Sequence, residues 1–229
     1  AEVRRPLIDP DRPVRPNGLA PHAPEPLAMD GTLDGFDTSE RLTLDYEDQY
    51  RRGEEPYGGP EEFSAAVTAN WDQSALYLGV DVLKPEVVVR PPGSPALLLD
   101  NEPDDIHADG VQVYLRPTAD APIYGFLVVP SEESGAIRAH GIRGTAGTDS
   151  MVRGAWLATE TGYALTLAIS VPEWHPRTGE AIDFDLLVNR MEPDRLRRAG
   201  QLVWSGGGGW VYLRGDRQDP ASFGTLELR

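Results

Sequence analysis

The sequence predicts an all-β protein: an antiparallel β-sandwich of the jelly-roll type, with long loops and at most short helices. Three observations lead to this fold class. Apolar and polar residues alternate in short segments, as in strands that bury one face. Turn-forming residues, 24 glycines and 21 prolines among 229, separate these segments at a spacing of about ten residues, as in sandwiches. No window longer than about ten residues carries the helical repeat of apolar positions.

The clearest elements are two strands that form a hairpin. Residues 63–70 and 76–83 are rich in apolar side chains, and the polar tetrapeptide 71–74 joins them. A short connection between two such segments indicates antiparallel pairing. In the second segment every other position is apolar, which predicts one buried face: Leu76, Leu78, Val80 and Val82.

Further strands are predicted along the rest of the chain. Residues 123–129 are apolar throughout, which predicts a strand covered on both faces. A period of two also occurs in three other segments: 111–115, 163–170 and 182–189. The remaining short candidates are strands at 211–213 and 225–228, and helices at 172–174 and 194–199.

The first 27 residues differ from the rest of the chain. Proline recurs there every few residues with little apolar sequence between: Pro6, Pro10, Pro13, Pro16, Pro21, Pro24 and Pro26. Proline lacks the N–H that a central strand or a helix needs, so we expect residues 1–27 to form an extended tail or linker and residues 28–229 to form the sandwich. The chain begins with Ala1, which we interpret as a mature secreted form or a fragment.

Composition and motifs exclude several classes of function. The net charge of -16 argues against a nucleic-acid partner, because phosphates require an excess of positive charge. The chain has no cysteine, which excludes disulfides and thiolate chemistry. No apolar run reaches the length of about 20 residues that a membrane-spanning helix needs. The metalloprotease, serine-hydrolase and phosphate-loop motifs are all absent, so we do not expect an enzyme.

The densest acidic cluster occupies residues 100–110, and a second acidic turn lies at 30–37. Oxygen ligands packed closely in a loop suit calcium, although the EF-hand spacing is not met. The alternative interpretation is ordinary turn chemistry, in which carboxylates bond to the local backbone. The candidate ligands of a structural calcium ion are Asp100, Glu102, Asp104, Asp105 and Asp109.

Seven short segments occur in a familiar order along residues 28–229: 29–34 (MDGTLD), 66–72 (AVTANWD), 75–78 (ALYL), 107–115 (HADGVQVYL), 162–169 (GYALTLAI), 182–189 (IDFDLLVN) and 219–226 (DPASFGTL). This order resembles the family 9 carbohydrate-binding modules and their DOMON-like relatives. The resemblance implies a non-catalytic sandwich in an extracellular or periplasmic protein, often with structural calcium. It also implies a glycan ligand, held in sugar-binding members between two tryptophans.

The sequence departs from this pattern at the sugar clamp. Ile106 and Arg217 stand at the two clamp positions, and Gln112 replaces a glutamate of the following strand. We therefore expect the usual clamp to be lost and other aromatic residues to take its place. Tyr57 lies in a loop rich in Gly and Pro. Two tryptophans flank residues 205–209, a serine followed by four glycines, which we call the glycine run. The candidate ligand-binding residues are Trp210, Trp204, Tyr57, Gln112 and Arg217.

Other interpretations remain open from the sequence. The tryptophans other than Trp210 are also compatible with packing in the core. A structural subunit that docks a protein partner through the sandwich and the proline-rich arm is one alternative function. A haem domain, as in some DOMON-like relatives, is another and is not expected; its candidate axial ligands are Met29, Met151, Met191, His107, His140 and Lys84.

Overall fold

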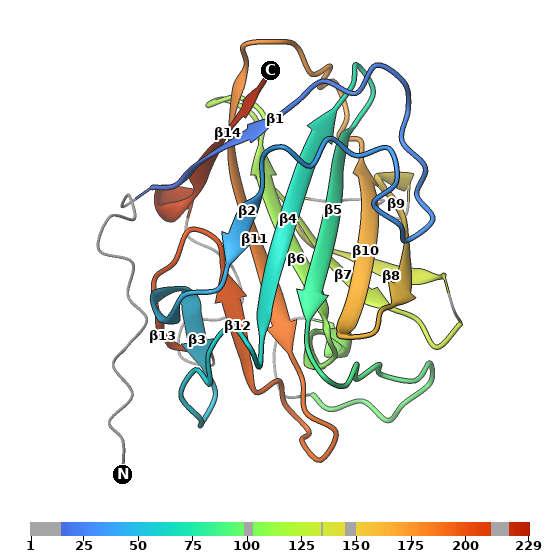
Figure 1. The fold of residues 1–229 in the computed structure, drawn as a ribbon, viewed down its shortest axis with the longest axis vertical. Coiled ribbons are helices and arrows are strands. Elements are labelled where there is room, and N and C mark those ends of the chain that lie inside the picture. Colours follow the sequence, from blue (N-terminus) through green and yellow to red (C-terminus); the bar gives the residue numbers. More distant parts are fainter. Residues whose placement is uncertain (1–14, 99–102, 134, 145–149, 212–219) are drawn as a thin grey trace.

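Two antiparallel sheets face each other in the computed structural model, which describes residues 15–98, 103–133, 135–144, 150–211 and 220–229 (Figure 1). The front sheet in Figure 1 has five strands in the order β2-β4-β5-β10-β9. Their bounds are β2 (Leu42–Leu44), β4 (Ser64–Trp71), β5 (Leu76–Leu83), β9 (Val152–Ala158) and β10 (Gly162–Ile169). The predicted hairpin is confirmed, because β4 and β5 pair antiparallel along their whole length.

The second sheet has nine strands, with the path β13-β3-β12-β11-β6-β7-β8 and with β14 pairing β11 and β1. Two contacts in it are parallel: β1 with β14, and β13 with β3. The strands are β1 (Asn17–Ala20), β3 (Tyr50–Arg52), β6 (Gly110–Arg116), β7 (Tyr124–Pro130), β8 (Ile137–Arg143), β11 (Ala181–Arg190), β12 (Gly200–Val203), β13 (Gly209–Trp210) and β14 (Gly224–Leu228).

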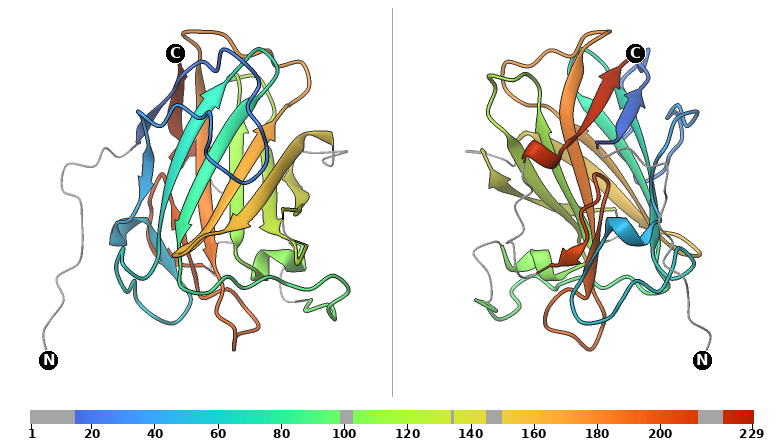
Figure 2. Two further views of the ribbon diagram at one scale, coloured as in Figure 1. Left: turned by 45° about the vertical axis from the view of Figure 1, so that its right-hand side comes forward. Right: turned by 90° about the vertical axis from the view of Figure 1, so that its left-hand side faces the viewer.

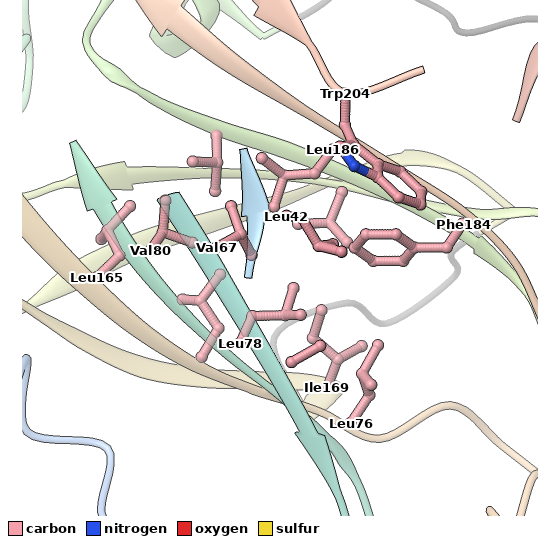
Figure 3. Close-up of a cluster of buried hydrophobic side chains, with 14 of the residues drawn as sticks. Leu42, Val67, Leu76, Leu78, Val80, Leu165, Ile169, Phe184, Leu186 and Trp204 are labelled. Atoms are coloured by element: carbon pink, nitrogen blue, oxygen red, sulfur yellow. The ribbon is translucent and has the colours of Figure 1, made fainter. Parts of the chain in front are cut away.

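Two further views show the sheets facing each other (Figure 2), and the main core of buried side chains lies between them. Alternate residues of each strand point into it, which is the packing that the period of two predicts. Figure 3 shows Val67, Val80 and Leu165 of the five-stranded sheet across from Phe184 and Leu186 of the other. The all-β class and the sandwich architecture predicted from the sequence are therefore confirmed.

The outer face of the nine-stranded sheet is also covered. A second apolar cluster there includes Ile106, Leu127 and Phe223, all buried. β7 is buried at every position, as its continuous apolar sequence predicts. Between β6, β11 and β12 the same face holds a buried network of amides in which both Gln112 and Gln201 donate to Asn189 Oδ1, at 3.1 and 2.8 Å.

Three predictions about the chain's elements need correction. Part of the segment expected as a tail belongs to the sandwich, because β1 pairs with β14. This strand lies at the edge of its sheet, where neighbouring prolines are tolerated, and the proline pattern hid it. The strand expected at 211–213 is instead β13, Gly209–Trp210, since Val211 lies in a turn and 212–213 fall outside the described residues.

The segments 172–174 and 194–199 form turns and irregular backbone rather than helices. The helical elements of the described residues are short 3-10 turns: η1 (Glu47–Gln49), η2 (Asp104–His107) and η4 (Pro220–Ser222). Within the described ranges, no helix is long and apolar enough to cross a membrane.

A buried ion pair joins the two sheets' loops at one end of the sandwich. Lys84, which follows β5, donates to Asp109 Oδ2 at 2.8 Å, and the exposed fractions of the two side chains are 3% and 0%. The same carboxylate accepts the backbone N–H groups of Val88 and Met191. Burial raises the pKa of Asp109 to about 6, against the opposing effect of Lys84. One carboxylate thereby ties together the segments that follow β5 and β11.

Candidate functional site: an aromatic pocket beside β3

A pocket of about 260 Å³ lies at the β3–β13 edge of the nine-stranded sheet, at the lower left of Figure 1. Three aromatic residues, Tyr50, Tyr57 and Trp210, line it together with one cation and one anion. The charged residues are Arg52 and Glu47, and the remaining lining consists of Pro56, Gly208 and Gly209. Aromatic faces beside a few polar groups form the kind of surface on which a ring-shaped ligand can stack and be oriented.

The glycine run 205–209 places Trp210 in this pocket. Gly206, Gly207 and Gly209 have φ values of 84°, 100° and 103°, a region that residues with a side chain rarely adopt. The amides of Gly207 and Gly208 both donate to the carbonyl of Asp48 at 3.2 Å, which holds the run against η1. The chain then pairs in parallel with β3, so that Trp210 is the register partner of Arg52.

Trp210 combines exposure with a fixed position. Its side chain is 41% exposed, whereas most large apolar side chains of the described residues are buried. The guanidinium carbon of Arg52 lies 4.4 Å from the centre of the indole ring. This cation–π contact, worth about 0.5–1 kcal/mol at an exposed site, holds the ring against β3 while much of its surface stays open.

Tyr50 and Tyr57 form the inner part of the pocket. Their rings lie 5.2 Å apart, and the Tyr57 hydroxyl donates to the carbonyl of Phe63 at 2.7 Å. Burial raises the pKa of Tyr50 to about 12 and raises that of Tyr57 further, so both hydroxyls stay protonated at neutral pH. Gly200 leaves the space that Tyr50 fills, because a Cβ there would lie 2.2 Å from its hydroxyl.

A buried carboxylate anchors the start of the glycine run. Asp185 Oδ1 accepts the backbone N–H of Ser205 at 3.0 Å, and Oδ2 accepts the Ser205 hydroxyl at 2.5 Å. Burial raises the pKa of Asp185 to about 6, although the Ser205 and Leu186 hydrogen bonds and the charge of Arg51 lower it. The carboxyl is completely buried, so its protonation is coupled to the stability of the fold.

We expect Asp185→Asn to change how the stability depends on pH. Because the folded pKa of about 6 lies above the usual 3.8, the folded state binds more protons between about pH 4 and 6. The wild-type free energy of unfolding therefore falls as pH rises through this window, by about 3 kcal/mol for this one group. The asparagine variant lacks this part of the decrease. Urea unfolding of both proteins from pH 4 to 7 measures the difference, and parallel profiles would contradict the prediction.

Only some of the sequence-predicted ligand residues line the pocket. Trp210 and Tyr57 meet in the pocket, as described above. Trp204 does not line this pocket: it is 4% exposed and packs in the core with its ring 5.7 Å from that of Phe184 (Figure 3). Trp204 directly follows β12, and its backbone N–H donates to the carbonyl of Leu186 at 2.9 Å, so its ring packs in the core between the sheets.

Gln112 and the first clamp position, Ile106, do not line the pocket. The Gln112 side chain is completely buried and bonds to Asn189 and the Tyr114 hydroxyl. Ile106 is buried in the second apolar cluster. Arg217 lies outside the described residues, so loss of the usual clamp stays a prediction.

The predicted calcium ligands are engaged by cations where the structure describes them. Hydrogen bonds from His140 and Arg138 outweigh the effect of burial and hold the pKa of Asp105 well below its usual range. Asp109 pairs with Lys84, and Asp104 lies 3.6 Å from Arg90. No group of three or more His, Asp or Glu side chains gathers as a metal site in the described part of the chain. Because Asp100 and Glu102 lie outside it, structural calcium stays a prediction.

Two of the haem-ligand candidates are held by carboxylates. The amine of Lys84 is held by Asp109, and the ring of His140 is bonded to Asp105. Met29 packs on the outer face of the five-stranded sheet, whereas Met151 packs against the core between the sheets. Haem binding stays an untested alternative.

Three pocket residues, Tyr50, Arg52 and Glu47, were not among the sequence-predicted ligand residues. Tyr50 and Arg52 lie on a three-residue strand, and Glu47 lies on a one-turn 3-10 helix, so no periodicity marks either element. Their approach to Trp210 depends on the pairing of β3 with β13, a contact between residues far apart in sequence. The clustering of Tyr46, Tyr50 and Tyr57 around a loop rich in Gly and Pro is the only sequence signal.

The comparisons place this fold in a known class. A family 9 carbohydrate-binding module from Caldicellulosiruptor kristjanssonii in complex with cellotriose matches with a TM-score of 0.67 and 16% identity, over 93% of this chain and 94% of that one. The module in complex with glucose matches with a TM-score of 0.65 and 17% identity, over 92% and 95%. No family model and no curated protein matches the sequence.

The chain therefore has the fold of the family 9 carbohydrate-binding modules, which confirms the resemblance found in the sequence. At this low identity the likeness concerns the fold, and the function has to be argued from the site.

Proposed function

We propose that the chain is a non-catalytic glycan-binding module whose ligand stacks on Trp210 in the aromatic pocket. The observation that carries the proposal is an exposed indole fixed beside two tyrosine rings and two charged groups. A sugar ring presents apolar C–H faces and a rim of hydroxyls. The aromatic rings suit the first, whereas Arg52 can donate to hydroxyls and Glu47 can accept from them.

The fold supports this proposal, because the similar structures include a module in complex with cellotriose and with glucose. The pocket provides an aromatic surface away from the clamp position Ile106, which is buried. As part of the same proposal, the module belongs to a secreted or periplasmic protein, where polysaccharides are met. The negative charge of -16 favours neutral or basic glycans over strongly acidic ones.

Affinity electrophoresis through gels that contain single polysaccharides tests the proposal, starting with β-1,4-glucans. We expect wild-type protein to be retarded by at least one of them. Trp210→Ala removes the stacking surface, worth about 1–3 kcal/mol, so affinity should fall by about five- to 150-fold.

The matched control is Trp174→Ala, which removes a half-buried tryptophan from a different pocket of the sandwich. This variant should keep the wild-type retardation. Migration of the wild type unaffected by every glycan would refute the proposal. Equal weakening by the two alanine variants would refute the assignment to this pocket.

A further inference from the structure

A second and larger pocket, of about 670 Å³, lies near the other end of the sandwich. Its lining consists of Trp71 at the end of β4, Gln73 of the β4–β5 turn, and residues 175–178 between β10 and β11, with His22 beside them. These segments lie at the top of Figure 1, close to the C-terminus, whereas β3 and β13 lie at the lower left. The two pockets are therefore separate sites.

The lining of this pocket is basic in an acidic protein. Its ionisable side chains are His22, His175 and Arg177, and no Asp or Glu lines it. All three side chains are exposed. Within the described residues, none of them has a side-chain hydrogen bond or an ion pair; the one contact is the edge of His22 on Trp71, with ring centres 4.7 Å apart. By contrast, Arg116, for example, is paired with Asp183.

Two carboxylates close to the lining in sequence, Asp72 and Glu180, are turned to other partners. Asp72 accepts from the amides of Ser74 and Ala75 with Oδ1 and from the Tyr77 hydroxyl, at 2.6 Å, with Oδ2. Glu180 lies 3.4 Å from the indole nitrogen of Trp174, outside the lining. The three basic groups consequently face the pocket without a carboxylate among them.

We propose that this pocket binds a ligand bearing an oxyanion: a carboxylate, sulfate or phosphate on a molecule of about the size of a sugar. Arg177 offers the planar fork that matches such groups, and protonated imidazoles offer further charged donors. Gln73 and Thr178 supply neutral hydrogen-bonding groups, and Pro176 contributes an apolar surface. This site is independent of the glycan site at Trp210, and either can exist without the other.

NMR of the histidine ring Cε1–H groups tests the proposal, because the four histidines include two internal references. His107 is buried and His140 is bonded to Asp105, whereas His22 and His175 line the pocket. We expect saturable shifts of the His22 and His175 signals on titration at pH 6, and only small shifts of the other two. The titrants are glucuronate, inorganic sulfate, inorganic phosphate and, as the neutral match, glucose. The anion whose shifts saturate at the lowest concentration identifies which group the pocket prefers: a carboxylate, a sulfate or a phosphate.

Two arginine variants complete the experiment. Arg177→Gln should weaken binding of the preferred anion by about tenfold or more, since it removes a charge-assisted hydrogen bond. Arg153→Gln, at an exposed arginine of β9 outside the lining, makes the same charge change and should leave the affinity within about twofold of wild type. The proposal is overturned if glucose produces the same shifts as the anions, if no titrant saturates, or if both variants weaken binding equally. The first of these outcomes would leave the Trp210 proposal intact.

Discussion

Replacing Lys84 by methionine should destabilise the protein by about 3–5 kcal/mol, because it leaves the carboxylate of Asp109 buried without its cation. Both side chains are almost fully buried, and their ion pair measures 2.8 Å. The two backbone amides that also bond to Asp109 cannot replace a full positive charge. Guanidinium unfolding at pH 7 measures the loss as a lower midpoint with an unchanged slope.

Two further variants separate loss of the charge pair from loss of packing. Lys84→Met combined with Asp109→Asn removes both charges and should recover a large part of the lost stability. Arg116→Gln breaks the Arg116–Asp183 pair, whose side chains are 29% and 28% exposed, and should cost no more than about 1 kcal/mol. An unfolding midpoint of Lys84→Met equal to that of the wild type would show that the pair contributes nothing.

The architecture was predictable where the sequence pattern is local. The β4–β5 hairpin has a clean period of two and a short polar connection, so its pairing follows from adjacent residues. Apart from β9, the strands that the sequence did not reveal are short or polar. β3 has three residues, two of them arginines, and β8 carries Arg138, His140 and Arg143 along an edge. Such strands are defined by their partners, not by their own pattern.

The site was predictable only in part, for the same reason. Trp204 and Trp210 flank the glycine run symmetrically in the sequence, yet one is buried in the core and the other is exposed. Trp204 directly follows β12 and bonds to Leu186 of β11 through its backbone, whereas Trp210 comes after the turn and lies on β13. Asp109 was grouped with calcium ligands as a member of an acidic run, whereas its charged partner in the fold is Lys84, 25 residues earlier. Contacts of this kind are fixed by the assembled sheets.

Gly208 offers a way to close the aromatic pocket without removing any of its groups. It lines the pocket, and its φ lies outside the positive region that disfavours side chains. An added Cβ would meet only the carbonyl oxygen of Tyr50, at 4.0 Å, so alanine fits there. Leucine at this position extends further into a space of about 260 Å³ and competes directly with a ligand.

Isothermal titration calorimetry on Gly208→Ala and Gly208→Leu tests the central claim most directly. The titrant is an oligosaccharide of the polysaccharide that retards the wild-type protein. Gly208→Ala should bind with close to the wild-type affinity. Gly208→Leu should bind at least about tenfold more weakly, equivalent to about 1.4 kcal/mol, while it unfolds at the wild-type temperature. Wild-type affinity in the leucine variant would contradict the account, because a ligand stacked on Trp210 cannot share the pocket with that side chain.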